Sequence, residues 1–436
     1  MVNSFTFTIK WIYFFIKFKL NYVSMTTTTE GGLKLKEHLL HLGIIGIKLG
    51  QFLYTNHEII NNEVRIVLES LLSSNVMHSE DDTRKMLAFD KNNYISNILS
   101  IEKDCLGSGS LAQVHICYLK ANPRKKYILK VAHPCIFDLE KEVKLLQNIL
   151  NTFSRFKKIN IDWDSFFKNI TVQIDLNNEA NNMKKFCEIY KDYEKISIPE
   201  SIYNDKYFIV MTYCEGTPMN KLLRTSKEYI LATNLLASCF FHTVYKYNMC
   251  HGDMHFGNVL VKPNGYISLI DFGICNYSID CHSKNNELIY NYREFILEHN
   301  MSSVEVLLST VIKQPENVSS NYIINVSFIF IYYFQNLTID YTKITDVDKF
   351  YLNLIFEFCD MYNLKVNGEA IYFILQLLIL EAFAYTNGEH NGLITIRTMS
   401  YMKTEPFFVK EMEEFINKFY KLEYDHEYDH IRKKYP

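Results

Sequence analysis

Three oxygen-bearing side chains stand close together in HGDMHFGNVLVKPNGYISLIDFG, the stretch that runs from His251 to Gly273. Asn258 and Asp271 flank a pattern of two short strands joined by a Pro-Asn-Gly turn, so we expect the hairpin to bring them together. A side-chain carbonyl and a carboxylate are ligands that suit Mg²⁺. Asp253, five residues before Asn258, should lie in a loop where it can position or deprotonate an acceptor. The stretch therefore predicts phosphoryl transfer, with Asp253, Asn258 and Asp271 as catalytic residues and Asn258 and Asp271 as metal ligands.

The spacing of these residues matches the protein-kinase signature, in which D-x-x-x-x-N precedes D-F-G. Two other interpretations are weaker. The aspartates could be ordinary turn residues, but the three groups stand in kinase order with short strand patterns between Asn258 and Asp271. His251 and His255 could bind zinc, but no Cys or Glu stands at a suitable spacing nearby.

The elements that must position these groups predict a mixed α+β chain. Residues 31–99 place apolar residues at helical spacing. Residues 101–134 have the pattern strand, glycine turn, strand, polar turn, strand, and residues 196–216 that of a hairpin. Beyond Gly216 the pattern is almost entirely helical, apart from the opening stretch. We expect a bilobal protein-kinase-like fold with a small β-rich N-lobe, a large helical C-lobe and an N-terminal helical extension carrying a KxGQ motif. The predicted segments are an extension at 1–30, a helical region at 31–100 that packs over the cleft, an N-lobe at 101–215 and a helical C-lobe at 216–436.

Length and composition bound the class of protein. The 436 residues, 48% of them hydrophobic, are enough for two sizeable lobes. The formal net charge of −3 and the pI of about 6.5 argue against a dedicated nucleic-acid binder. The ten cysteines are scattered without a CxxC pair. This pattern favours free thiols in a reducing compartment, cytoplasmic or mitochondrial, over a disulfide or zinc framework.

Several stretches raise the question of a membrane or a metal. Residues 1–30 alternate basic and aromatic side chains, but the uncharged core 11–16 is too short to span a bilayer. We expect a targeting segment, a membrane-surface segment or a poorly ordered extension there. The windows 316–340 and 370–386 are apolar but contain polar or charged residues, and we expect core helices. The terminal repeat EYDHEYDH at 423–430 is expected to be a solvated tail and not a metal site.

Three further motifs narrow the class. KLGQ, from Lys48 to Gln51, lies in the N-terminal helical region, SGSLAQVH in the first predicted hairpin, and QIDLNNEANN at the start of a helical pattern. Together with HGDMHFGN and DFG they resemble, in order, the KxGQ, AQVH, ExD-EA, HxDxHxGN and DFG patterns of the UbiB/ADCK (AarF-type) atypical kinases, as a divergent member. Each motif is weak alone, but five in order across residues 41–275 are specific. HGDMHFGN by itself also fits the aminoglycoside and choline phosphotransferases, and His255 and Gly257 favour the atypical kinases.

The resemblance implies roles for the matching residues. Lys130 would hold the α- and β-phosphates of ATP, and Glu179 would pair with it, since a buried lysine needs a partner. The implied cofactor-binding residues are Gly107, Ser108, Gly109, Ser110, Lys130 and Glu179. The KxGQ segment would cover the cleft as a regulatory lid, whose residues here are Lys48, Gln51, Gln173 and Asp175.

The chain departs from the family pattern in three motifs, at four positions. Gly107 and Gly109 stand where much of the family has an Ala-rich turn. Glycine tolerates the φ angles that let backbone amides approach phosphate, so the restrained nucleotide use associated with the Ala-rich turn is in doubt. Gln173 replaces the first acid of ExD, and a Lys–Gln hydrogen bond is weaker than a Lys–Glu pair, so the lid should be looser or held by Asp175 alone. Thr212 lies where the family commonly has an acidic connector residue, a loss that backbone contacts to adenine should tolerate.

The function implied by the resemblance is an ATP-binding, Mg²⁺-dependent atypical kinase or ATPase linked to quinone or other lipid metabolism. Its implied partners are nucleotide, a lipid or isoprenoid small molecule and a peripheral membrane contact, with no nucleic acid. A non-catalytic pseudokinase scaffold that binds nucleotide or lipid is the first alternative, and the complete set of candidate site residues counts against it. A small-molecule phosphotransferase of the aminoglycoside or choline type is the second, and KLGQ and AQVH count against it.

Overall fold

The chain divides into two compact units. The computed structural model describes residues 4–55, 60, 62–71, 77–153, 167, 170–247, 249–254, 256–277, 301–312, 322–336, 354–355, 357–359, 361–362, 364 and 394–426. The first unit comprises residues 1–158, 163–187 and 199–213, and the second comprises 159–162, 188–198 and 214–436.

The first unit begins with helices. Their bounds are α1 (Ser4–Leu20), α2 (Tyr22–Thr27), α3 (Thr29–His41), α4 (Ile44–Thr55), α5 (Asn62–Glu69) and α6 (Glu80–Leu87). In α1 the side chains of Phe7, Trp11 and Phe14 are buried, because their three- and four-residue spacing puts them on one helix face. The stretch expected to be a targeting, membrane-surface or poorly ordered segment is thus helical from Ser4 and packs one aromatic face inward.

Glycines let α3, α4 and α5 approach closely. Gly43, between α3 and α4, has φ +77°, a conformation that favours glycine. A Cβ at Gly46 would lie 2.1 Å from the carbonyl oxygen of Leu39, and one at Gly50 would lie 2.4 Å from Cδ1 of Leu71. A larger residue in place of the glycine of KLGQ, Gly50, would therefore displace the Leu71 side chain.

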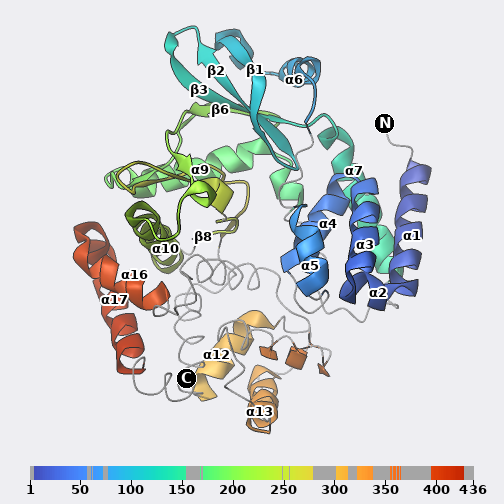
Figure 1. Ribbon diagram of the computed structural model, residues 1–436, viewed down its shortest axis with the longest axis vertical. Coiled ribbons are helices and arrows are strands. Elements are labelled where there is room, and N and C mark those ends of the chain that lie inside the picture. The colour runs from blue at the N-terminus through green and yellow to red at the C-terminus, as the bar shows by residue number, and fades with distance from the viewer. Residues whose placement is uncertain are drawn as a thin grey trace. The chain divides into compact units, whose positions relative to one another are not determined.

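A five-stranded antiparallel sheet follows the helices in the first unit, with the strand order β1-β2-β3-β6-β5 (Figure 1). Its strands are β1 (Ile98–Ser108), β2 (Ala112–Leu119), β3 (Asn122–Ala132), β5 (Ser201–Asp205) and β6 (Phe208–Thr212), preceded by the short helix η1 (Tyr94–Asn97). Helices α7 (Ile136–Phe153) and α9 (Leu176–Tyr190) complete the unit. The sheet core includes Leu129, Val131 and Ile209, all at 0% exposure.

The second unit contains two small sheets and several helices. One sheet has the order β4-β10-β9-β7, and the other pairs β11 with β8. The strands are β4 (Ile196–Ser197), β7 (Thr217–Pro218), β8 (Met249–His251), β9 (Val259–Val261), β10 (Ile267–Leu269) and β11 (Cys275–Tyr277). The helices are η3 (Met219–Lys221), α10 (Lys227–Tyr247), η4 (Phe256–Asn258), α12 (Met301–Val311), α13 (Tyr322–Gln335), α16 (Ile394–Thr404) and α17 (Pro406–His426). Helix α10 forms much of the described core, with thirteen buried residues.

The prediction of a mixed α+β chain with an N-terminal helical region and sheets is confirmed. The first strand begins at Ile98, slightly earlier than its sequence pattern indicated. Part of the window 316–340 forms α13, whereas the window 370–386 and the end of the terminal repeat, 427–430, lie outside the described residues. Among the described helices, none has the length and apolar character needed to cross a bilayer.

Candidate active site

Lys130 lies on β3, the central strand of the five-stranded sheet. It stands opposite Val114 of β2 and Ile209 of β6, and its strand neighbours Leu129 and Val131 are fully buried. Lys130 is therefore not a surface lysine on an edge strand, because it lies inside the sheet and its side chain is only 12% exposed.

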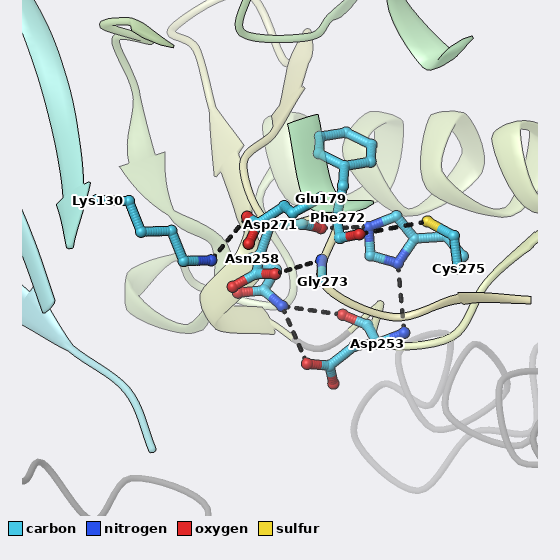
Figure 2. Close-up of polar contacts among 9 residues, drawn as sticks. Lys130, Glu179, Asp253, Asn258, Asp271, Phe272, Gly273 and Cys275 are labelled. Atoms are coloured by element: carbon cyan, nitrogen blue, oxygen red, sulfur yellow. Dashed lines mark hydrogen bonds and ion pairs between the residues drawn. The ribbon is translucent and has the colours of Figure 1, made fainter. Parts of the chain in front are cut away.

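Glu179 pairs with Lys130 in the same unit. The Nζ atom of Lys130 lies 2.6 Å from Oε1 of Glu179, whose side chain is 3% exposed (Figure 2). Glu179 lies in the first turn of α9. Strand contacts fix that end of the helix, because the backbone N–H of Leu176 donates to Lys206 O and the Asn204 side chain donates to Asn177.

Asp175 directly precedes α9. Its Oδ1 accepts the backbone N–H of Asn177 at 3.0 Å, so it satisfies one of the unpaired donors at the helix start. Its carboxylate therefore helps to begin the helix that carries Glu179. Gln173 is half-buried two residues earlier.

The glycine turn of residues 107–110 is an open hairpin turn. Gly107 and Ser108 end β1, and the N–H of Gly109 donates to Ala112 O at 2.8 Å. Neither Gly107 nor Gly109 has a positive φ, so this turn does not use the conformational freedom that glycine offers. A Cβ would meet nothing within 4 Å at Gly107 and only Ala112 O, at 3.7 Å, at Gly109. The backbone shown has room for alanine at both positions.

KLGQ lies on α4 in the first unit. Lys48 and Gln51 are half-buried, and the Gln51 amide donates to the Leu71 carbonyl at 3.0 Å. Gln51 thus ties α4 to the end of α5. A role of Lys48, Gln51, Gln173 and Asp175 in a lid stays a prediction.

The side chains of the AQVH motif make hydrogen bonds that the sequence did not predict. The side chain of Gln113 accepts the N–H of His78 at 3.0 Å and donates to the carbonyl oxygen of His78 at 3.3 Å. It also lies 2.8 Å from Nε2 of His115, whose Nδ1 lies 3.3 Å from the carbonyl oxygen of Glu102. These two side chains therefore hold the segment that leads into α6 against β2.

The second unit brings together the three candidate catalytic residues of the opening stretch. The Asn258 amide nitrogen lies 3.0 Å from the Asp253 carbonyl oxygen and 3.5 Å from its Oδ2 (Figure 2). In this orientation Oδ1 of Asn258 is the acceptor that could ligate a cation. The N–H of Ile270 donates to Asn258 O at 3.1 Å, which closes the hairpin that places Asp271 near Asn258. Oδ1 of Asp271 accepts the N–H of Gly273 at 2.9 Å.

His251 joins the two ends of this hairpin. Its Nδ1 accepts the N–H of Asp253 at 3.3 Å, and its Nε2 lies 2.6 Å from the carbonyl oxygen of Asp271. A carbonyl only accepts, so Nε2 carries the proton and the imidazole is a neutral cross-link. Strand pairing of His251 with Cys275 and a ring contact with Phe272 hold it in place. The sequence indicated His251 only as a possible zinc ligand, whereas in the structure it positions the backbone at Asp253 and Asp271.

The chemistry of this set suits a hard cation better than zinc. Asn258 and Asp271 offer oxygen ligands, and Mg²⁺ usually takes one or two such side chains together with phosphate and water. Within the described ranges no group of three or more His, Cys, Asp or Glu side chains could hold a metal. His255, named in the zinc alternative, lies outside those ranges.

Comparisons with known proteins agree with the motif pattern. The family model described as the ABC1 atypical kinase-like domain matches residues 70–304. An uncharacterised protein encoded in the hydrogenase 1 5′ region of Clostridium pasteurianum is 30% identical over 254 residues, which cover 55% of this chain and 47% of that protein. AarF domain-containing kinase 1 of Drosophila melanogaster is 26% identical over 253 residues, 53% of this chain and 48% of its own. Probable protein kinase UbiB of Histophilus somni is 29% identical over 250 residues, 53% of this chain and 46% of its own.

The chain spans about half the length of these curated relatives. A solved Mycobacterium tuberculosis protein in complex with erythromycin is 19% identical, with a TM-score of 0.46 over 65% of this chain and 72% of its own. That likeness is too slight to carry an argument. The family model, by contrast, covers more than half of the 436 residues and agrees with the predicted UbiB/ADCK resemblance. The chain therefore belongs to the ABC1 atypical kinase-like family, a kinase-like family that implies nucleotide use.

Proposed function

We propose that the chain is an ATP-binding, Mg²⁺-dependent atypical kinase or ATPase. The observation that carries the proposal is the ion pair of Lys130 and Glu179, 2.6 Å apart, with side chains 12% and 3% exposed. Burying two charges is costly, and apolar residues of similar volume are often as stable or more so. The pair is therefore better explained by a ligand than by stability, and a lysine held by a carboxylate is how kinases hold the α- and β-phosphates.

The groups of the second unit supply the complementary chemistry. Asn258 and Asp271 would hold Mg²⁺, and Asp253 would position the acceptor or take its proton. His251 supports both roles, because it fixes the backbone on either side of the hairpin. Under this proposal the turn of residues 107–110 lies against the phosphates of the nucleotide.

The lid and the acceptor are also part of the proposal. Gln51 already holds Leu71, and Asp175 already caps α9. We propose that these two residues form the regulatory lid together with Lys48 and Gln173. The family resemblance implies a link to isoprenoid-quinone or other lipid metabolism, so we propose a lipid or isoprenoid small molecule as a partner.

Binding of Mg-ATP by isothermal titration calorimetry tests the proposal. Lys130→Ala should abolish binding, whereas Lys126→Ala, which removes an exposed lysine from the same strand, should leave it unchanged. The proposal fails if the wild-type chain does not bind Mg-ATP, or if Lys130→Ala binds it as tightly as Lys126→Ala does.

A further inference from the structure

A buried histidine, His133, contacts the glycine turn of residues 107–110. His133 follows the last residue of β3 and is 1% exposed. Its ring Nε2 lies 3.0 Å from the carbonyl oxygen of Gly109 and 3.5 Å from Oγ of Ser108. Its backbone N–H also donates to the carbonyl of Leu111 at 2.9 Å. The side chain of His133 therefore binds the turn at Gly109, and its backbone N–H binds Leu111, the residue that follows the turn.

The protonation of His133 determines that of a second histidine, His78. Because the Gly109 carbonyl only accepts, Nε2 of His133 must carry the proton, and its Nδ1 presents a lone pair. That Nδ1 lies 2.7 Å from Nδ1 of His78, which must then be the donor. Nε2 of His78 in turn lies 2.9 Å from the hydroxyl of Thr83, which can donate to it. The hydrogen bonds run in one direction, from Thr83 of α6 through two imidazoles to Gly109.

Electrostatics keep the imidazole rings of His78 and His133 neutral, as this series of hydrogen bonds requires. Burial lowers the pKa of His133 against the opposing effect of its bond to Gly109. Burial, followed by repulsion from His133 and His115, lowers the pKa of His78 to about 4, with Asp82 acting in the opposite direction. At neutral pH the two rings are therefore not both protonated at Nδ1. Two Nδ1–H groups would otherwise face each other, since the two nitrogens are only 2.7 Å apart.

The contact with His133 decides which way a peptide group of the turn points. The carbonyl of Gly109 and the N–H of Ser110 share one trans peptide plane and point in opposite directions. Binding the carbonyl to His133 therefore directs the Ser110 N–H away from the sheet core. The N–H of Gly109 is already used by Ala112. Neither a positive φ nor close packing fixes the conformation of Gly107 or Gly109. The orientation of the Gly109–Ser110 peptide therefore depends more on the side chain that binds it than it would in a rigid turn.

We propose that His133 and His78 are positioning residues for the nucleotide turn, and that the segment leading into α6 controls nucleotide affinity through them. The inference rests on the proposed function, because it gives the turn a phosphate to bind. It also explains why Gln113 holds the backbone of His78 on both sides. That grip keeps His78 in register with His133.

Two isosteric substitutions at one position separate the two contacts of His133. In His133→Gln the amide nitrogen can take the place of Nε2 and keep the bond to Gly109. In His133→Asn the amide can take the place of Nδ1 and reach His78, but not Gly109. Both remove the imidazole, so each is the other's control for general loss of packing.

Mg-ATP binding at neutral pH is the measurement, with the unfolding midpoint of each variant recorded without nucleotide. His133→Asn should weaken binding about fivefold, the effect of one net hydrogen bond, and His133→Gln should stay within about twofold of wild type. His78→Ala, which removes the donor that fixes the His133 tautomer, should weaken binding like His133→Asn. His78→Asn, which can keep that donor, should not.

The outcomes separate this inference from the function on which it rests. If wild type binds Mg-ATP but the Gln and Asn variants of His133 bind it equally, the positioning role is refuted and the proposed function stands. If both His78 variants bind like wild type, control by the segment before α6 is refuted. If wild type itself does not bind Mg-ATP, the proposed function fails and the inference fails with it.

Discussion

Removing the charges of Lys130 and Glu179 one at a time and together separates stability from function. Lys130→Met removes the cation paired with Glu179, whose side chain is 3% exposed, and Glu179→Met removes the anion paired with Lys130, whose side chain is 12% exposed. Breaking a buried pair by removing one partner costs about 3–5 kcal/mol. The double variant buries two apolar chains of similar length, so its free energy of unfolding should lie within about 1 kcal/mol of wild type. The double variant should therefore be more stable than either single variant.

Urea unfolding followed by circular dichroism measures the four midpoints of this cycle, and calorimetry measures Mg-ATP binding by the same proteins. The double variant should be folded and stable yet should not bind Mg-ATP, because the phosphate-binding cation is gone. If the two single losses of stability simply add in the double variant, the pair is not the buried, coupled unit described here. If the stable double variant binds Mg-ATP, the ion pair does not serve the nucleotide.

Three further predictions follow from local geometry. Gly107→Ala should raise the free energy of unfolding by about 0.4–1 kcal/mol, since the backbone and the space already suit alanine, and a lower urea midpoint would contradict that geometry. Gly50→Ala should lower it by about 1–3 kcal/mol through overpacking against Leu71, and the same substitution should cost less in a Leu71→Ala background, where the crowding side chain is gone; equal midpoints for wild type and Gly50→Ala would mean that α4 and Leu71 are not in close contact. The free energy of unfolding should also fall as pH drops from about 6.5 toward about 4. The reason is that burial lowers the folded-state pKa of His78 to about 4 and of His242 to about 3, so in this window the unfolded chain binds protons that the folded chain does not; urea midpoints that stay flat over this range would refute it.

Local spacing was enough to predict much of the candidate site. Asn258 and Asp271 are joined by one hairpin, so their proximity follows from strand and turn patterns alone. Lys130 lies on a strand whose apolar neighbours indicate an interior position. The mixed α+β character and the N-terminal helices likewise follow from periodicity.

Contacts between distant segments could not be predicted in this way. His78 and His133 are 55 residues apart, and their hydrogen bond depends on how the segment before α6 packs against β2. The ordinary φ angles at Gly107 and Gly109 show a related limit, since glycine permits unusual conformations without requiring them. Asp175 lies at a helix boundary, the feature that periodicity locates least well, and there it caps α9.

The metal dependence of ATP binding tests the central claim most directly. Asp271→Asn keeps an acceptor for the Gly273 N–H but removes the charge that would hold Mg²⁺. ATP affinity should be measured for wild type and this variant, once with Mg²⁺ and once with EDTA. The account predicts that wild type binds ATP more tightly with Mg²⁺, and that Asp271→Asn binds ATP like EDTA-treated wild type in both conditions. An equal gain from Mg²⁺ in the two proteins would contradict it.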